Sequence, residues 1–238
     1  MNEQISEAVI RRLPGYYRHL RELEANGIQQ ISSQELGRRM HQTPSLVRQD
    51  INSFGGFGRQ GYGYDVKELK DCIGNILNLN EKHRMIILGA GNIGTAVARY
   101  RSFSLEGFET VAMFDISPER IGQRIGDIPI LSMEELEAYL HGHMVDIAVI
   151  ALPGEDAQST LERLIACGVR AVWNFAPIDL THDEKIITIV NVHLSDSLQV
   201  LSYKLAHRDD ASDDEEHDIQ DDLVHGAESY ADTVQQKE

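Results

Sequence analysis

The sequence predicts an α/β protein that combines a small helical domain, a parallel-sheet domain and a separate C-terminal helix. Apolar residues recur at helical spacing in the first 64 residues, and buried-strand runs then alternate with helical segments over residues 82–192. Strands that alternate with helices are typical of a parallel sheet. We therefore expect four segments, which are residues 1–80 with a connector helix, 81–192, 193–207 and an acidic tail at 208–238.

Composition fits a globular chain. Of the 238 residues 42% are hydrophobic, yet no run approaches the roughly 20 apolar residues that a membrane helix needs. The N-terminus carries acidic residues and no apolar leader, so we expect no secretion signal. Cys72 and Cys167 lack metal-ligand spacing and fit a reducing compartment. We expect a cytoplasmic protein with no membrane span and no metal site.

Charge is unevenly distributed. The net charge is −16, but residues 208–238 carry −10 of it, whereas residues 1–64 carry +2 and hold clustered arginines. The acidic tail lacks apolar periodicity, which predicts disorder, and the alternative is a mimic of DNA that competes for a basic face. Because the N-terminal charge is positive, the acidic total does not exclude nucleic-acid binding.

The first 52 residues predict a helix-turn-helix. A first helix over residues 3–25 is closed by Gly27, and Ser32 to Glu35 reads as a capping box that opens a short helix. Thr43-Pro44 then caps a third helix, with proline at the first turn where its missing N–H costs nothing. In this motif the second of the paired helices lies in the major groove of DNA.

The third helix would present polar side chains that can hydrogen-bond base edges or phosphates. These are Ser45, Arg48, Gln49 and Asn52. The glycine-rich segment that follows predicts a β-hairpin wing anchored by Phe54, Phe57, Tyr62 and Tyr64, with Arg59 at its tip. We count Arg59 and Tyr62 among the DNA-contacting residues. The alternative is a three-helix packing domain with a solvated arginine face, since helix-turn-helix patterns are not specific.

A dinucleotide fingerprint follows in its proper context. A buried-strand run at residues 84–88 leads directly into Gly89-Ala90-Gly91-Asn92-Ile93-Gly94 and then into the helical pattern TAVARYRSF. The glycines permit a tight turn, a close approach of a pyrophosphate and close helix packing. A second strand ends in Asp115, whose carboxylate would accept bonds from the ribose hydroxyls and repel a 2′-phosphate. The pattern predicts a Rossmann domain that binds NAD(H) rather than NADP(H).

Two later strands lead into loops. The runs VDIAVIALP and RAVWNFAP end at residues 153 and 177, and ligands of open α/β sheets bind beyond the carboxyl ends of strands. These loops are therefore candidates for a nicotinamide pocket, and the alternative is a pair of ordinary βα turns. The candidate residues are Leu152, Pro153, Asn174, Ala176 and Pro177.

Catalytic machinery is missing from this pattern. A dehydrogenase needs a group that moves a proton alongside the hydride, and only His193 lies near a strand end in this half. The Rossmann unit also leaves no room for a substrate domain. We therefore expect a sensor without catalytic residues. The rivals are an NAD-dependent dehydrogenase-like enzyme with an N-terminal oligomerisation domain and a regulator that binds CoA or another nucleotide.

Residues 8–206 contain several long and distinctive stretches. They are RRLPGYYRHLRELEANGI, ISSQELGRRM, VRQDINSFGGFG followed by GYGYDV, LGAGNIG, FDISPERIG, ALPGEDAQ, NFAPIDL and NVHLSDSLQVLSYKL. In these stretches the chain resembles the Rex family of redox-sensing repressors. The resemblance implies a winged-helix domain, a Rossmann domain and a C-terminal helix swapped between the subunits of a homodimer. It also implies that NADH displaces NAD⁺ and thereby releases an inverted-repeat operator.

Some family residues carry over and others differ. Arg48 matches a residue of the DNA-binding helix, and Tyr100 matches a tyrosine of the nicotinamide pocket. The usual lysine after the DNA-binding arginine is Gln49 here and the usual tyrosine before Phe-Gly is Ser53, so the resemblance implies DNA binding but does not define the exact operator sequence.

His193 replaces an aspartate that pairs with an arginine in the DNA-competent state, and Arg18 occupies the arginine position. The resemblance thus makes Arg18 and His193 the switch residues. The alternatives are other contacts such as Asp196 or a His193 that only packs at the domain junction.

Overall fold

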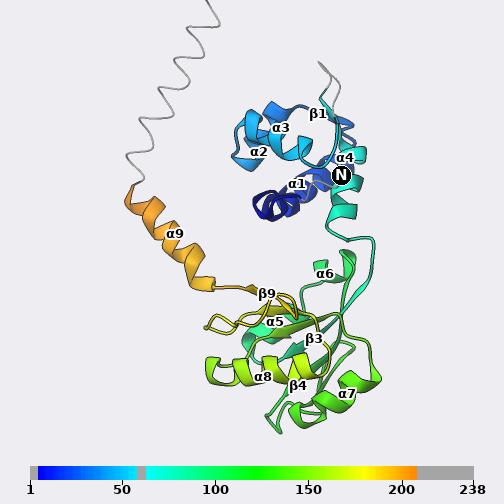
Figure 1. Ribbon diagram of the computed structural model, residues 1–238, viewed down its shortest axis with the longest axis vertical. Helices are drawn as coiled ribbons and strands as arrows, with labels where there is room; N and C mark the ends of the chain where they lie inside the picture. Colours follow the sequence, from blue (N-terminus) through cyan, green and yellow to red (C-terminus); the bar gives the residue numbers. More distant parts are fainter. Residues whose placement is uncertain (1–4, 58–62, 208–238) are drawn as a thin grey trace, which may run out of the picture. The chain divides into compact units, whose positions relative to one another are not determined.

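A computed structural model describes residues 5–57 and 63–207 of the chain. The compact units are residues 1–148 and residues 149–238, and Figure 1 labels many of their helices and strands. Within the described ranges no helix is both long enough and apolar enough to cross a membrane. Residues 208–238, for which the sequence predicts disorder, lie outside the described residues.

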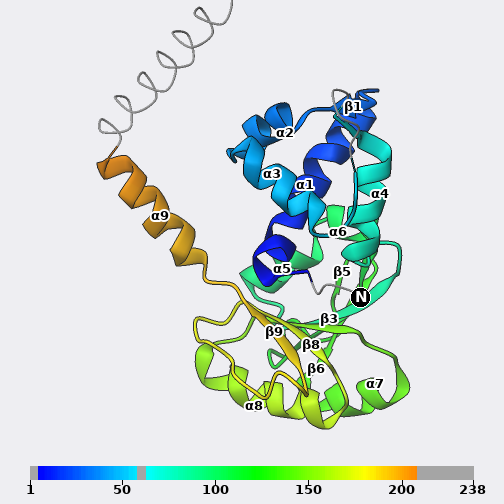
Figure 2. The same ribbon diagram turned by 45° about the horizontal axis from the view of Figure 1, so that its top comes forward.

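The first unit begins with helices that enclose one apolar core. α1 packs against α2 and α4, and α2 packs against α3 (Figure 2). The bounds are α1 Glu7–Ala25, α2 Ser33–Met40, α3 Pro44–Asn52 and α4 Val66–Ile76. Fully buried core residues include Leu13, Leu20, Leu36, Val47, Ile51, Leu69 and Ile73. The predicted connector is therefore largely a core helix, because α4 buries one apolar face in this domain.

The turn between α2 and α3 has the predicted caps. The Ser32 Oγ accepts from the Glu35 amide at 3.1 Å, and the Thr43 Oγ1 accepts from the Leu46 amide at 3.3 Å. Gly37 lets the turn close, since a Cβ there would lie 2.6 Å from the Gln42 carbonyl oxygen. The helix-turn-helix is thus present at the predicted residues.

The short antiparallel sheet differs from the predicted hairpin wing. β1 (Gln30–Ile31) pairs with β2 (Tyr64–Asp65), so the partner of Tyr64 precedes α2 and is not part of the glycine-rich segment. Ile31 and Tyr64 are both buried in the helical core, which favours this pairing over a solvent-exposed hairpin. Phe54 and Phe57 pack against the same core. Arg59 and Tyr62 lie outside the described residues.

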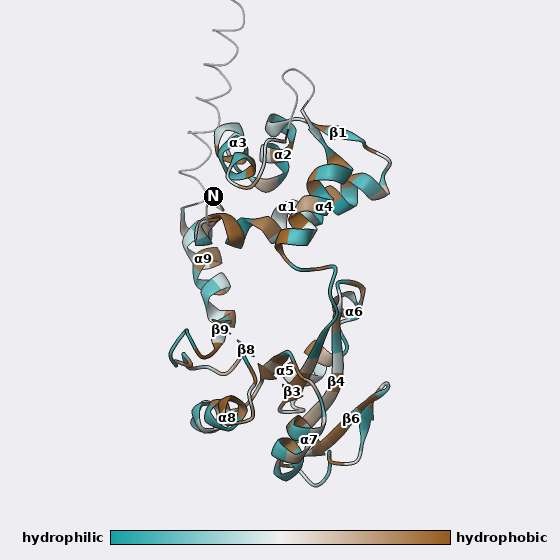
Figure 3. Ribbon diagram, turned by 45° about the vertical axis from the view of Figure 1, so that its right-hand side comes forward, coloured by the Kyte–Doolittle hydropathy of each residue, from teal (hydrophilic) through white to brown (hydrophobic). Residues whose placement is uncertain are grey.

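The rest of the first unit is the beginning of a parallel sheet. β3 and β6 both run parallel to β4, with Ile86 opposite Ala112 and Met113 opposite Ile130. The apolar end of β3 is buried on both faces, as parallel strands are, and is coloured brown in Figure 3. The bounds are β3 His83–Leu88, α5 Asn92–Ala98, α6 Ser102–Leu105, β4 Phe108–Asp115, β5 Arg124–Ile125, β6 Ile128–Ser132, η1 Met133–Glu135 and α7 Leu136–Gly142.

The second unit continues the pattern of strands and helices. β8 and β9 are parallel, with Ala171 opposite Thr188. The remaining bounds are β7 Ile147–Ile150, α8 Gly154–Ala166, β8 Ala171–Asn174, β9 Thr188–Asn191 and α9 Leu194–Ala206. The strand order is β5-β6-β4-β3-β7-β8-β9. Apart from the antiparallel edge strand β5, this is the order of a doubly wound dinucleotide-binding sheet, which confirms the predicted fold class.

Candidate DNA interface and nucleotide site

The outer face of α3 carries the side chains predicted to read DNA. Its inner face buries Val47, Asp50 and Ile51, which are spaced by three and four residues. The opposite face exposes Ser45, Arg48, Gln49 and Asn52. The prediction that these four side chains point outward is confirmed, and their contact with DNA stays a prediction.

Contacts between α2 and α3 order this face before any ligand binds. Arg48 Nη1 donates to Ser33 Oγ at 3.0 Å, and the hydroxyls of Thr43 and Ser45 lie 3.0 Å apart. These bonds are exposed and exchangeable. A phosphate or a base edge can therefore take their place without leaving a buried group unpaired.

Two arginines of α2 share one carboxylate. Glu35 accepts from Arg38 at 2.8 and 2.9 Å and from Arg39 at 2.9 Å. These hydrogen bonds lower the pKa of Glu35 to about 2. The capping box predicted from Ser32 is therefore only half formed, because the Glu35 side chain is used by the arginines instead of the helix terminus.

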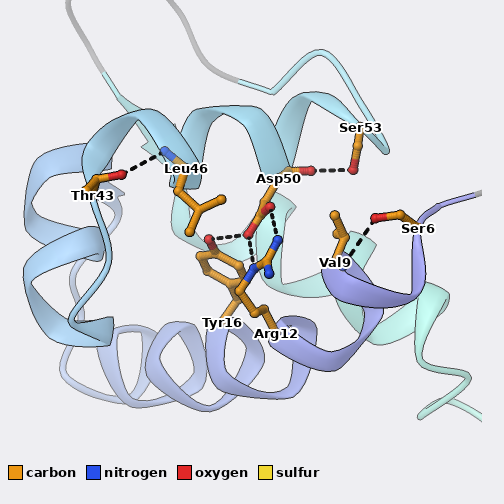
Figure 4. A network of polar contacts seen from close by, with 8 residues as sticks. All are labelled: Ser6, Val9, Arg12, Tyr16, Thr43, Leu46, Asp50 and Ser53. Atoms are coloured by element: carbon orange, nitrogen blue, oxygen red, sulfur yellow. Dashed lines mark hydrogen bonds and ion pairs between the residues drawn. The ribbon is translucent and has the colours of Figure 1, made fainter.

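A buried polar network joins α1 to α3 (Figure 4). Arg12 binds Asp50 through two parallel bonds, Nε to Oδ2 at 2.7 Å and Nη2 to Oδ1 at 2.6 Å. The Tyr16 hydroxyl donates to the same Oδ2 at 2.9 Å, and Asp50 is only 1% exposed. Burial, together with the bond to Asp50, raises the pKa of Tyr16, so its phenol remains a donor. We call these three residues the Asp50 network.

The glycine fingerprint forms the predicted tight turn between β3 and α5. Gly89 has a φ of 98°, which disfavours other residues, and its amide donates to the Phe114 carbonyl at 2.8 Å. A Cβ on Gly94 would lie 1.9 Å from the Gly89 carbonyl oxygen, so α5 crosses β3 too closely for any side chain. A Cβ on Gly91 would meet nothing within 4 Å. The turn thus leaves open the place where a pyrophosphate is expected.

The residues after the turn are accessible, but the helix is shorter than predicted. Asn92 and Ile93 are exposed at the start of α5. The expected continuous helix breaks after Ala98, and Tyr100 lies between α5 and α6 with 58% of its surface exposed. Its ring stacks at a tilt on Phe103 with centroids 4.6 Å apart. Tyr100 is therefore accessible, and its contact with a nicotinamide stays a prediction.

Asp115 ends β4 directly beside the glycine turn. Its carboxylate accepts from the Ala90 amide at 2.7 Å, the Ser117 amide at 2.8 Å and Arg120 Nη1 at 3.2 Å. Burial acts to raise the pKa of Asp115, but these hydrogen bonds outweigh it and hold the pKa below its usual value. A carboxylate has about four lone-pair positions, so acceptor capacity remains for a ribose hydroxyl. Arg120 balances part of the charge that would repel a 2′-phosphate.

The predicted nicotinamide-pocket residues of the second unit lie in two adjoining loops. A Cβ on Gly154 would lie 2.9 Å from the Ile178 side chain, so the two loops approach closely. Asn174 is fully buried, accepts from the Ala176 amide at 2.9 Å, and donates to the Ile178 carbonyl at 2.8 Å and to Asn191 at 2.9 Å.

The loop residues differ in their accessibility. Asn174 and Ala176 are buried, whereas Pro153 and Pro177 are exposed and Leu152 is half-buried. The amide of Asn174 therefore shapes the loop from inside. Exposed neighbours such as Pro153 and Pro177 remain the better candidates for a ligand contact, which stays a prediction.

The two switch residues lie in different units. Arg18 is exposed on α1. His193 precedes α9, and its Nε2 lies 2.8 Å from Asp179 Oδ1. A carboxylate is therefore present beside His193, although residue 193 itself supplies none.

Sequence reasoning missed Asp50, Asp179 and Arg120. Asp50 falls on the apolar stripe of α3, and a charge among inward-facing positions is a signal that could have marked it as paired. Arg120 follows Asp115 by five residues and carried no comparable signal. The pairing of Asp179 with His193 spans 14 residues of loop and strand, which no periodicity describes.

Two protein families match separate parts of the chain. The family described as "Putative DNA-binding protein N-terminus" matches residues 4–52, and the "CoA binding domain" family matches residues 80–178. A redox-sensing transcriptional repressor Rex from Caldanaerobacter subterraneus subsp. tengcongensis is 48% identical over 84% of this chain and 89% of its own length. The Rex of Clostridium beijerinckii is 48% identical over 86% of this chain and 96% of its own length.

Solved structures give the same answer. The structure of RSP in complex with β-NAD⁺ and operator DNA is 45% identical, covers 87% of this chain and 94% of its own, and has a TM-score of 0.80. The structure of RSP with β-NADH is 43% identical, covers 86% of this chain and 96% of its own, and also has a TM-score of 0.80. RSP is a Rex-family repressor. This chain therefore belongs to the Rex family of redox-sensing transcriptional repressors.

Proposed function

We propose that this protein represses transcription from an inverted-repeat operator and leaves it when NADH replaces NAD⁺. The observation that carries the proposal is the 48% identity to Rex repressors over most of both chains. RSP, which shares the fold at 45% identity, was crystallised with β-NAD⁺ and operator DNA. The exposed outer face of α3 and the open glycine turn provide the two sites that this function needs.

The DNA half of the function rests on α2 and α3. We assign Arg48 and Gln49 to base edges or adjacent phosphates, with Ser45 and Asn52 as further polar contacts. Arg59 and Tyr62, which lie outside the described residues, are proposed as wing contacts. Arg48→Ala should remove specific binding but keep NADH affinity, because Arg48 lies outside the nucleotide turn.

The nucleotide half rests on the glycine turn and on the end of β4. We assign the pyrophosphate to Gly89, Gly91, Asn92, Ile93 and Gly94. Asp115 would accept from the adenosine ribose. Tyr100 and the loops that hold Leu152, Pro153, Asn174, Ala176 and Pro177 are assigned to the nicotinamide end. These residues bind and orient NAD(H), which supplies the redox signal, and we assign none of them a catalytic role.

We further propose that the protein is a homodimer that uses α9. This helix buries none of its residues, and its exposed apolar side chains contribute the brown segments of α9 in Figure 3. They are Leu194, Leu198, Val200, Leu201, Tyr203 and Leu205. Exposed apolar residues in such a row favour burial against a partner. Leu198→Glu with Leu201→Glu should yield a monomer in sedimentation equilibrium.

The switch is proposed to involve Arg18 and the His193–Asp179 pair. Neutral His193 can accept one hydrogen bond from an arginine, whereas a protonated imidazolium would repel it. Asp179 can supply the negative charge that the histidine lacks. Operator affinity should therefore differ between wild type and His193→Asp when both are titrated from about pH 6 to 8, with and without NADH. Identical titrations at every pH would remove His193 from the switch.

One experiment tests the proposed function directly. Operator affinity is titrated with NADH and with NAD⁺ in parallel, and only NADH should release the DNA. Turnover of NADH with a panel of small carbonyl compounds serves as the opposing test, because the rival enzyme would oxidise NADH. We place the protein in the cytoplasm, since a repressor must reach the DNA it regulates.

A further inference from the structure

The inner face of α3 contains a polar network that base reading itself does not require. Asp50 lies on the same helix as Arg48, Gln49 and Asn52 but points the opposite way, into the domain (Figure 4). It accepts three hydrogen bonds from α1, two from Arg12 and one from Tyr16. The carboxylate is 1% exposed, so these bonds are formed away from bulk water.

Apolar contacts alone would leave the orientation of α3 weakly defined. Val47 and Ile51 anchor the helix by burial, which is non-directional. The parallel Arg12–Asp50 bonds are directional, because a guanidinium fork fits a carboxylate in one plane only. The Tyr16 hydroxyl adds a second direction at the same oxygen atom. If α3 rotated about its axis, these hydrogen bonds would break, whereas much of the apolar contact of Val47 and Ile51 would remain.

Stability is a poor explanation for such a network. Replacing both members of a buried ion pair with apolar residues of similar volume is often neutral or stabilising, because each buried charge carries a desolvation penalty. A core of Leu and Ile would suffice to hold α3 in place. The feature that an apolar replacement cannot supply is a defined angle between α1 and α3.

We propose that the Asp50 network positions the recognition helix α3 and so sets the sequence discrimination of its exposed face. The proposal rests on the DNA-binding function proposed above. The three residues of the Asp50 network do not touch DNA. They act by fixing where Arg48 and its neighbours meet the groove. Base contacts need side chains held to within about 0.5 Å, so a small rotation of α3 should cost specific contacts before phosphate contacts.

The decisive variant replaces the pair without leaving a charge behind. Arg12→Met combined with Asp50→Leu removes both charges with side chains of similar shape, and Tyr16→Phe removes only the hydroxyl. Arg11→Met is the matched control, because Arg11 is a neighbouring α1 arginine whose bond to Glu7 lies in solvent. All variants are made in the full chain.

The probe is the duplex that the wild-type chain selects from a random DNA pool, and the readout is its affinity relative to a scrambled duplex. Thermal unfolding and NADH affinity are measured on the same samples. We expect the double variant to lose about tenfold in the affinity ratio, the effect of one lost base contact, while it remains folded at the assay temperature. Tyr16→Phe should lose only about threefold, because the two Arg12 bonds still orient α3, and Arg11→Met should lose nothing.

The remaining outcomes distinguish failure of the positioning role from failure of the proposed DNA-binding function. If the wild type selects no sequence, the proposed function fails and the positioning role fails with it. If the wild type selects a sequence and folded variants discriminate as well as it does, the positioning role alone is overturned. Should the double variant not fold, Tyr16→Phe decides the question, and an unchanged affinity ratio for it overturns the proposal.

Discussion

Two buried aspartates, Asp50 and Asp115, show how differently one residue type can be held. Asp50 is bound by side chains of a helix that precedes it by 34 and 38 residues. Asp115 is bound mainly by backbone amides of the glycine turn and of its own strand end, with Arg120 as a third donor. Both are almost inaccessible, at 1% and 5% exposure.

The difference lies in what each carboxylate leaves free. A bidentate arginine and a tyrosine occupy Asp50 from inside the domain, so it can only connect α1 to α3. The amides that hold Asp115 are fixed by the backbone and orient the carboxylate at the carboxyl end of β4, where ligands of such sheets bind. The side-chain donors around Asp50 therefore position the helix α3. The backbone amides around Asp115 instead orient its carboxylate so that it can accept a hydrogen bond from a ligand.

The largest effect should follow from removal of the Asp50 carboxylate. Asp50→Ala leaves the Arg12 guanidinium partly buried and unpaired, and should lower the free energy of unfolding by about 3 kcal/mol, the lower end for buried pairs. Urea unfolding followed by circular dichroism measures this. Arg11→Ala, which breaks an exposed pair, should cost less than about 1 kcal/mol. Equal losses in both variants would contradict the comparison.

Removal of the Asp115 carboxylate should change the preference of the protein for NADH over NADPH. Lost ribose hydrogen bonds and charge repulsion should together make NADPH bind more weakly than NADH to the wild type, by about 1.5–3 kcal/mol. Asp115→Ala should abolish most of that difference, as measured by calorimetry with both cofactors. Arg120→Gln is the companion variant, and it should raise the preference for NADH slightly because the carboxylate loses its counter-charge. Equal wild-type affinities would show that Asp115 does not select the cofactor.

Alkaline pH should act on the Asp50 network through Tyr16. The pKa of Tyr16 is raised by burial and by Asp50, so above pH 10 the unfolded chain loses a proton that the folded chain keeps. The stabilisation is complete below pH 10 and then declines as pH rises, by at most about 1.4 kcal/mol per pH unit for one group. Urea unfolding at pH 9 to 11 should show a steeper decline for the wild type than for Tyr16→Phe. Parallel curves would mean that Tyr16 ionises normally.

Acid should act on Asp115, with the smallest effect. Its pKa is held below the ordinary value of 3.8, so the folded state favours the ionised form. The resulting stabilisation is present above that value and is lost as pH falls below it. The wild type should therefore lose more stability than Asp115→Asn when pH is lowered from 5 toward 3 in urea unfolding. A larger loss in the variant would reverse the sign and refute the lowered pKa.

The sequence by itself determined the local features of this protein. The fingerprint glycines, the caps at Ser32 and Thr43, and the outward face of α3 all appeared where they were predicted. Each depends on residues a few positions apart, because turn conformations, caps and helical periodicity are set within one or two turns of backbone. Asp115 was identifiable for the same reason, since its distance from the glycines is fixed by one helix and one strand.

Only the tertiary structure decided the pairings between distant segments. Arg12 and Asp50 are 38 residues apart, β1 finds its partner beyond α3, and α5 stops at Ala98 although the helical pattern runs on. These outcomes depend on how whole helices pack, which places side chains from different elements together and lets burial override local propensity. The polar face of α3 was therefore predictable, whereas the buried network behind it was not.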